Sequence, residues 1–227
     1  EIRQSLDTFK VRPLERLRLL ELLGPQFIGV HAVHLLDEEI VLLAEQGCHV
    51  AHCPSSNLKL GSGVAPTTKL LEAGVNIGIG TDGAASNNHL DIWEEMRLAA
   101  LLAKGLSGRA NTVPAHAALA MATLNGAKAL GLDGQIGSLT PGKQADIVAV
   151  ALSGAATQPC YDPISQLVYS AGREQIRHVW VAGERVVKDG RCITLDETAI
   201  IRRAHQWREK IAAGQVETGV VLTPNRD

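Results

Sequence analysis

The sequence predicts an α/β fold in which parallel strands are connected by helices. Three short apolar segments have the composition of buried strands: 27–31, 48–52 and 75–80. Segments with helical periodicity or helix-capping residues separate them, and the strands end about 20 to 30 residues apart, as β–α–β units require. Doubly wound sheets and (β/α)8 barrels share this alternation, and both carry their chemistry at the carboxyl ends of the strands.

Helices are expected before, between and after these strands. Residues 1–23 carry leucines at helical spacing and are followed by Gly24-Pro25, which stops a helix. Further helices are predicted at 37–46, 66–74, 90–104 and 114–130. Two segments, 54–63 and 81–88, are rich in polar and small residues, so we expect loops there.

The pattern changes after Gly131, where short β-type segments alternate with glycine- and proline-containing turns. They predict a small antiparallel region from 136–139, 146–152, 176–181 and 185–187. An amphipathic helix is predicted at 196–213, followed by an irregular tail. We therefore divide the chain into three parts: 1–131, 132–195 and 196–227.

Composition excludes several classes of protein. The 227 residues carry 22 basic and 24 acidic side chains, and the formal net charge of −2 gives no field to attract nucleic acid or an anionic membrane. No apolar run reaches the roughly 18 residues of a membrane span. The four cysteines have neither C-x-x-C spacing nor the density of a disulfide scaffold, so we expect reduced thiols and a cytoplasmic location.

Three side chains that can bind metal or move protons stand at the predicted strand ends: His31, His52 and Asp82. Each has an ordinary explanation on its own, because strand-end histidines commonly pack and an aspartate in Thr-Asp-Gly commonly forms a turn. Together they are more informative, since the carboxyl ends of parallel strands converge on one cleft. The seven small or polar residues from Asp82 to Asn88 would also let a ligand approach the backbone closely.

Several other catalytic motifs are missing from the sequence. No strand is followed by a phosphate-binding or dinucleotide-binding glycine pattern. The H-x-E…P-C-x-x-C signature of zinc cytidine deaminases and the G-x-S-x-G nucleophile elbow are also absent.

Three segments resemble the amidohydrolase superfamily: 50–60 (VAHCPSSNLKL), 80–88 (GTDGAASNN) and 142–148 (GKQADIV). They are most similar to the branch of 5-methylthioadenosine/S-adenosylhomocysteine deaminases and related chlorohydrolases, and the likeness covers essentially the whole chain. The resemblance implies a (β/α)8 TIM barrel beside a small β-sandwich. On that template the three predicted strands are barrel strands six to eight, and the region after Gly131 is the C-terminal part of the sandwich.

The resemblance also implies roles for individual residues. Asp82 matches the aspartate that ligates the metal, normally Zn²⁺, and takes up a proton from the attacking water. His31 matches the histidine that orients this water. Asn57 and Ser86 lie in loops that line the substrate pocket of the family, so they are substrate-binding candidates together with Asp82. His52 matches no metal ligand of the family, and we expect it to be a packed group behind the site.

The implied reaction is hydrolytic deamination at C6 of an adenine nucleoside, with a metal-activated water as the nucleophile. The family also needs an H-x-H pair and an H-x-x-E motif, and neither motif occurs in this sequence. We therefore expect these residues to be the C-terminal half of a longer polypeptide, which needs its N-terminal half for metal binding and turnover.

Two alternatives remain open. One is a related amidohydrolase that acts on guanine or a triazine, as deaminase or chlorohydrolase, because the substrate-selecting side chains would lie largely outside this chain. The other is a non-catalytic scaffold, because a single metal ligand is too few for a zinc site. For the enzyme we expect a small purine nucleoside as the partner, a homo-oligomer, and no nucleic acid or membrane.

Overall fold

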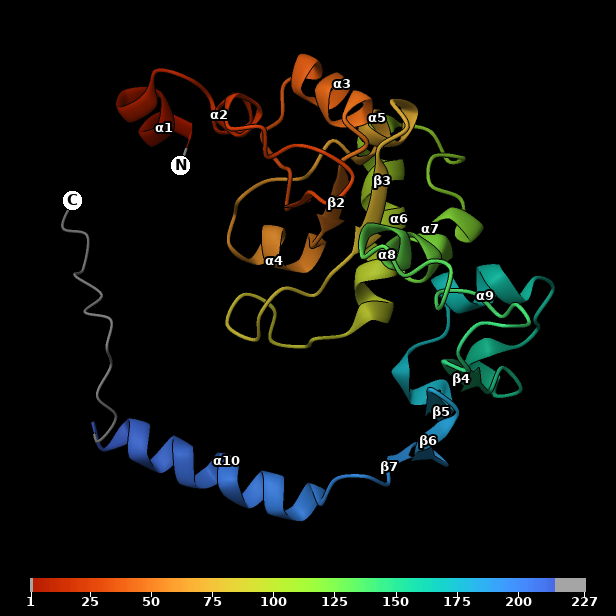
Figure 1. The fold of residues 1–227 in the computed structure, drawn as a ribbon. Coiled ribbons are helices and arrows are strands. Elements are labelled where there is room, and N and C mark those ends of the chain that lie inside the picture. The colour runs from red at the N-terminus through yellow and green to blue at the C-terminus, as the bar shows by residue number, and fades with distance from the viewer. Residues whose placement is uncertain (1, 215–227) are drawn as a thin grey trace.

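The computed structural model describes residues 2–214, and their strands form two separate sheets (Figure 1). The first sheet is parallel and has the order β1 (Ile28–Val30), β2 (His49–His52), β3 (Asn76–Ile79). The second is antiparallel and has the order β4 (Ile147–Val150), β5 (Ile176–Val181), β6 (Glu184–Lys188), β7 (Arg191–Cys192). The predicted α/β class and the parallel pairing of the first three strands are therefore confirmed.

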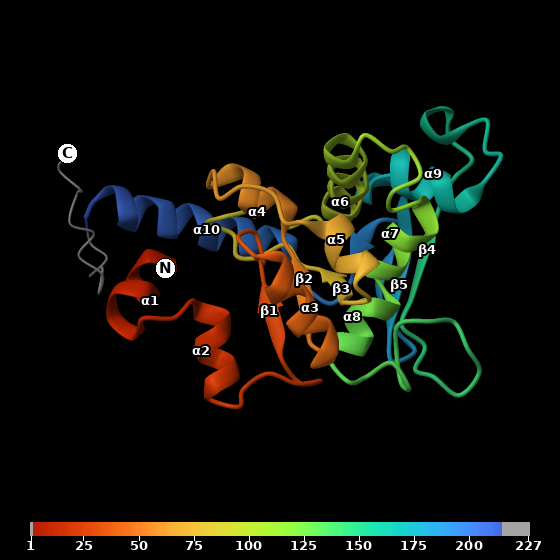
Figure 2. The same ribbon diagram turned by 90° about the horizontal axis from the view of Figure 1, so that it is seen from above.

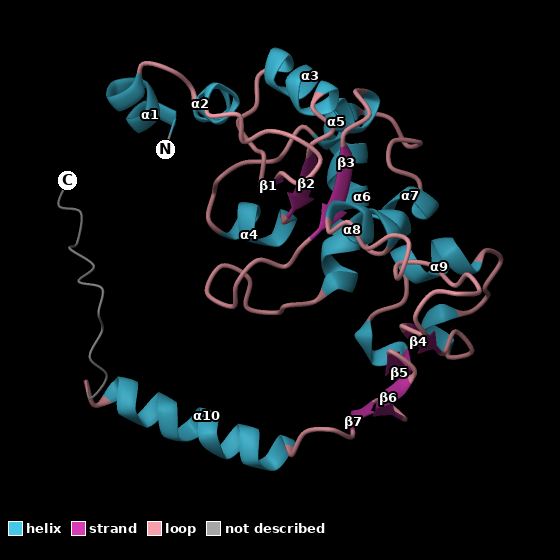
Figure 3. Cartoon of the chain, in the orientation of Figure 1, coloured by secondary structure: helices cyan, strands magenta, loops and turns pink. Residues whose placement is uncertain are grey.

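Helices surround the parallel sheet and connect it to the antiparallel one (Figures 2 and 3). In the first half of the chain they are α1 (Ile2–Phe9), α2 (Pro13–Leu19), α3 (Asp37–Glu45), α4 (Pro54–Lys59) and α5 (Thr67–Glu72). In the second half they are α6 (Ile92–Ser107), α7 (Ala115–Met121), α8 (Leu124–Ala129), α9 (Pro163–Tyr169) and α10 (Glu197–Ala212). Two short 3₁₀ turns lie at Ala155–Thr157 and Arg173–Gln175.

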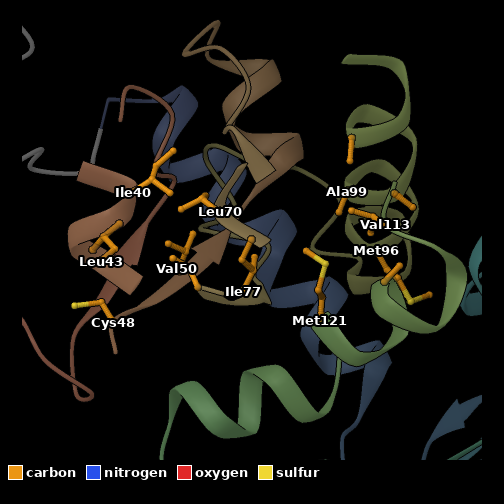
Figure 4. Packing of buried hydrophobic residues seen from close by; sticks show 14 of the residues in the cluster. Ile40, Leu43, Cys48, Val50, Leu70, Ile77, Met96, Ala99, Val113 and Met121 are labelled. Atoms are coloured by element: carbon orange, nitrogen blue, oxygen red, sulfur yellow. The ribbon is translucent and has the colours of Figure 1, made fainter. Parts of the chain in front are cut away.

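The main core lies between the parallel sheet and its helices (Figure 4). Val50 of β2 and Ile77 of β3 point into it and are 1% and 0% exposed. Leu43 of α3, Leu70 of α5 and Met96 of α6 belong to the same buried cluster. This apolar layer fixes the strands in register, and so fixes the positions at which the chain leaves them.

The prediction of one helix over 1–23 is wrong, because the structure has two helices there. Helix α1 ends at Phe9, Lys10 takes a left-handed backbone with φ of 64°, and α2 begins at Pro13. Proline has no amide hydrogen and its ring clashes with the preceding turn, so it starts a helix rather than continuing one. The leucines at helical spacing begin only at Leu14, after the break, so their periodicity supports α2 and not a helix that starts at residue 1.

Two further predictions need correction. The expected loop 54–63 contains α4, which again begins at a proline, Pro54. The expected helix 114–130 is divided into α7 and α8 by Thr123, whose φ of −135° and ψ of −95° are not helical. The Thr123 hydroxyl donates to the carbonyl of Leu119, which is the kind of local bond that competes with helix continuation.

The region after Gly131 is less purely β than its pattern predicts. Residues 136–138 form a bend and Leu139 is irregular, so no strand forms there. An additional short strand, β7, is present, and 163–169 form the helix α9. The predicted helix at 196–213 is present as α10, whereas the predicted irregular tail, 215–227, lies outside the described residues.

Helix α9 packs on α6 and α7, so the segment after Gly131 is attached to the first part of the chain. Trp93 Nε1 donates to the carbonyl of Leu167 at 2.6 Å, and Arg97 Nε donates to that of Val168 at 3.0 Å. The division at 131/132 stays a prediction.

Helix α10 extends away from both sheets in Figure 1, and nearly all of its side chains are exposed. Within residues 2–214, no helix combines the length and the apolar character needed to cross a membrane.

Removing side-chain volume from the core should destabilise the parallel sheet. Ile77→Ala leaves a cavity at a fully buried position, so we expect a loss of about 2–5 kcal/mol in the free energy of unfolding. Urea denaturation measures this loss. The control Leu106→Ala, at a residue of α6 that is 66% exposed, should stay within about 0.5 kcal/mol of wild type. Equal effects of the two substitutions would contradict the described packing.

Candidate active site at the carboxyl ends of the parallel strands

The ends of the parallel strands bring His31 and Asp82 together. The amide of His31 donates to the Ala51 carbonyl, and that of Gly80 donates to the His52 carbonyl, each at 3.0 Å. The chain after β1 and the chain after β3 therefore leave the sheet on either side of β2. His31 Nε2 lies 3.9 Å from Asp82 Oδ2.

Both residues have a left-handed backbone, with φ of 69° at His31 and 61° at Asp82. Ala32 follows with φ of 52°. Such values are uncommon for residues with a Cβ atom and persist only where the surrounding structure imposes them. The turns after β1 and β3 are therefore held in shape by the contacts of their side chains.

The Asp82 carboxylate is held by two serine hydroxyls. Ser86 Oγ donates to Oδ2 at 2.6 Å, and Ser56 Oγ donates to the same oxygen at 2.7 Å. These two bonds, together with the backbone N–H of Gly83, lower the pKa of the Asp82 carboxyl to about 2. The group is therefore an anion at neutral pH, as a metal ligand or a proton acceptor must be.

Helix α4 supplies the partner of His31. Asn57 Oδ1 and His31 Nδ1 are 2.9 Å apart, so the amide contacts one side of the imidazole ring while the other side faces Asp82. Asn57 is 2% exposed, whereas His31 is half-buried and Asp82 is exposed. Of the three residues predicted to bind substrate, Asp82 is exposed, Ser86 lies half-buried beside it, and Asn57 lies behind His31.

His52, the third strand-end residue, is separate from this pair. Its side chain is 1% exposed, and neither ring nitrogen has a hydrogen-bond partner within residues 2–214. Burial, with a smaller contribution from the nearby His31, lowers the pKa of His52 to about 4. His52 is therefore a neutral, packed imidazole at physiological pH.

The sequence pattern missed three residues that organise the site: Ser56, Asn87 and Glu95. Ser56 and Asn87 stand in the two polar segments that were expected to be loops, but nothing in the pattern distinguishes them from their neighbours. Glu95 has the spacing of an ordinary helical residue, yet it is 1% exposed and accepts hydrogen bonds from Ser55 and Asn87.

A metal site built from the described residues alone would be incomplete. Residues 2–214 contain no group of three or more His, Cys, Asp or Glu side chains that could hold a metal ion, whereas structural zinc sites have four ligands and catalytic sites have three plus water. What the residues do offer fits one part of such a site: an ionised, hydrogen-bonded carboxylate with an imidazole at 3.9 Å.

Removing one hydroxyl should move the acidity of Asp82 in a defined direction. Ser86 makes the largest contribution to the low value, so Ser86→Ala should raise the pKa of Asp82 towards its ordinary value of 3.8. A pH titration of the Asp82 carboxyl carbon by NMR measures this. The lowered pKa stabilises the fold above pH 3.8, and this contribution is lost as the pH falls through about 2. The difference in the free energy of unfolding between wild type and Ser86→Ala should therefore disappear as the pH falls from 3.8 to about 2.

Ser138→Ala is the matched control, because the Ser138 hydroxyl contacts Thr140 outside the site. It should leave the Asp82 titration unchanged. An unshifted pKa of Asp82 in Ser86→Ala would show that this hydroxyl does not hold the carboxylate.

Several known proteins are similar to this chain in sequence and in fold. A 5-methylthioadenosine/S-adenosylhomocysteine deaminase from Teredinibacter turnerae is 50% identical over 213 residues, which are 94% of this chain and 48% of the relative. A zinc-bound adenosine deaminase from Xanthomonas campestris has a TM-score of 0.92 and 46% identity, over 94% of this chain and 48% of that one. An atrazine chlorohydrolase from Arthrobacter aurescens, complexed with zinc, has a TM-score of 0.85 and 28% identity, over 90% of this chain and 46% of that one.

This chain spans about half the length of the curated relatives it matches. The family model described as "Amidohydrolase family" matches residues 1–186, which include all three strand-end residues and the antiparallel strands β4 and β5. The resemblance of segments 50–60, 80–88 and 142–148 to this superfamily is therefore confirmed, and the chain belongs to the amidohydrolase family.

Proposed function

We propose that this chain supplies part of the active site of a metal-dependent deaminase that hydrolyses an adenine nucleoside of the 5-methylthioadenosine or S-adenosylhomocysteine type. The observation that carries the proposal is the Asp82 carboxylate: it is ionised, stands at a strand end, and faces His31 at 3.9 Å. The 50% identity to a relative with this named activity supports the choice of substrate.

In the proposed protein, β1, β2 and β3 are strands six to eight of a (β/α)8 barrel, and the antiparallel sheet is part of a small β-sandwich. The match to half of the Xanthomonas campestris enzyme, with a TM-score of 0.92, supports this placement. The remaining strands and metal ligands would belong to the half of the relatives that these residues do not cover. We use "the complete protein" for the chain that includes that half.

Asp82 is the residue of this chain that would hold zinc. When bound, zinc lowers the pKa of a coordinated water to about 7, which makes the water a nucleophile at neutral pH. The zinc named in two structurally similar proteins supports this choice of metal.

The residues of this chain would then handle the protons of the reaction. Asp82, with a pKa of about 2, is ionised at neutral pH and can accept a proton from the attacking water. His31 Nε2 faces the same position from the neighbouring strand end and can orient the water by a hydrogen bond. The water oxygen bonds to C6 of the purine, and the bond from C6 to the exocyclic amino nitrogen breaks. That nitrogen leaves as ammonia with one proton of the water, and the second proton ends on ring N1 of the 6-oxo product.

The proposed partner is a small purine nucleoside, and Asn57 and Ser86 remain proposed substrate-side residues. Ser86 is the better placed for direct contact because it is half-buried, whereas Asn57 is 2% exposed and reaches the site through His31. A cytoplasmic location and a homo-oligomeric state are also proposed, the first supported by the four free cysteines.

Substitution of Asp82 should abolish activity with little change in fold. In the complete protein, Asp82→Ala should reduce deamination to background, and His31→Gln should reduce kcat by about 10²–10⁴-fold, as loss of a proton-handling group does. Ammonia release from 5-methylthioadenosine measures both. Asp37→Asn, which removes a surface ion pair to Lys69, is the control and should retain full activity. Normal turnover by Asp82→Ala would refute the proposed site.

A substrate and metal panel separates this function from its alternatives. The complete protein should contain stoichiometric zinc and release ammonia from an adenine nucleoside faster than from guanine or an aminotriazine. Preference for guanine, or chloride release from a chlorotriazine, would identify the related amidohydrolase activity that the structural likeness to the chlorohydrolase also allows. Absence of both zinc and turnover would support a scaffold.

A further inference from the structure

The side chain of Glu95 is a buried carboxylate with no role in the reaction described above. It lies in the first turns of α6, next to the buried Met96, and is 1% exposed. Placing a charge there is costly unless hydrogen bonds compensate for lost water. Both donors that the described residues place on it are neutral N–H groups, one at the start of α4 and one in the loop after β3, so the carboxylate joins two segments rather than pairing with a cation.

One of these bonds leads to helix α4. The backbone amide of Ser55 donates to Glu95 Oε2 at 3.0 Å. The next residue, Ser56, is fully buried, and its hydroxyl donates to Asp82 Oδ2 at 2.7 Å. Glu95 therefore anchors the start of α4 at the position from which one of the two serine hydroxyls reaches Asp82.

The other bond leads to the loop after β3. Asn87 Nδ2 donates to Glu95 Oε1 at 2.6 Å and to the Thr81 carbonyl at 2.9 Å. Asn87 Oδ1 accepts from the amides of His89 and Leu90, so the orientation of the Asn87 amide group is fixed on both sides. Its neighbour Ser86 donates the second hydroxyl bond to Asp82 Oδ2, at 2.6 Å.

We propose that Glu95 is a positioning residue that fixes the Asp82 carboxylate, because its two oxygens anchor the two segments whose serines hold Asp82 Oδ2. The inference rests on the proposed function for its catalytic consequence. A carboxylate is needed because each oxygen accepts from an N–H group. A glutamine would present one NH₂ group to a donor and would lose one of the two bonds.

The test compares Glu95→Gln with Glu94→Gln in the complete protein. Glu94 is the next residue on α6, is exposed, and contacts His89 at the surface. Glu95→Gln should weaken zinc binding and lower kcat by about 10–100-fold, the usual effect of losing the groups that orient a metal ligand. KM for 5-methylthioadenosine should change by less than about 3-fold. Glu94→Gln should match wild type, and thermal unfolding should show both variants folded at the assay temperature.

Crystal structures of the two variants give a readout that does not depend on activity. Asp82 should leave its position against Ser56 and Ser86 in Glu95→Gln and keep it in Glu94→Gln. If Glu95→Gln is less stable but its folded form keeps the zinc affinity, kcat and Asp82 position of wild type, Glu95 is merely structural and the inference is wrong. If wild type itself has neither zinc nor turnover, the proposed function fails, while the Asp82 position still decides whether Glu95 holds it.

Discussion

The candidate site depends on the hydrogen bonds that the Asp82 carboxylate accepts. Asp82 stands at the end of β3 with a left-handed backbone, and its Oδ2 receives hydroxyl hydrogens from Ser56 and Ser86. These serines follow neighbouring strands, so they meet at Asp82 only because β2 and β3 are parallel and in register. The low pKa of the Asp82 carboxyl and the short distance from its Oδ2 to His31 Nε2 both depend on this arrangement.

The apolar core and the polar site support one another. Val50 and Ile77 hold β2 and β3 beneath their helices, which sets the points where the strands end. Beyond those points the chain is fixed by polar contacts, because a loop that presents groups to a ligand cannot bury many apolar side chains. Lys59 adds a further tie at the exposed end of α4, where its ammonium group contacts the carbonyl of Ala85. A strained backbone at His31 and Asp82 can persist because both sets of contacts restrain it.

Much of this arrangement can be predicted from the sequence, and the exceptions have physical reasons. Apolar runs locate the three strands, and the rule that parallel strands share one functional edge places His31 near Asp82. The break before Pro13 was missed because the leucines from Leu14 onward indicate a helix without showing where it begins, and the break at Thr123 because it lies within an alanine-rich run. The role of Glu95 could not be predicted, since its partner Ser55 lies 40 residues away and no local pattern shows that the two meet. The residues that would complete the metal site are not among those described.

The position of the metal tests the account most directly. Crystals of the complete protein grown with zinc would locate the ion by anomalous scattering at the zinc absorption edge. The account predicts a peak about 2.0–2.2 Å from a carboxylate oxygen of Asp82, the normal zinc–oxygen bond length. A zinc ion bound elsewhere, with Asp82 held only by Ser56 and Ser86, would contradict the claim that this carboxylate is the chain's contribution to the metal centre.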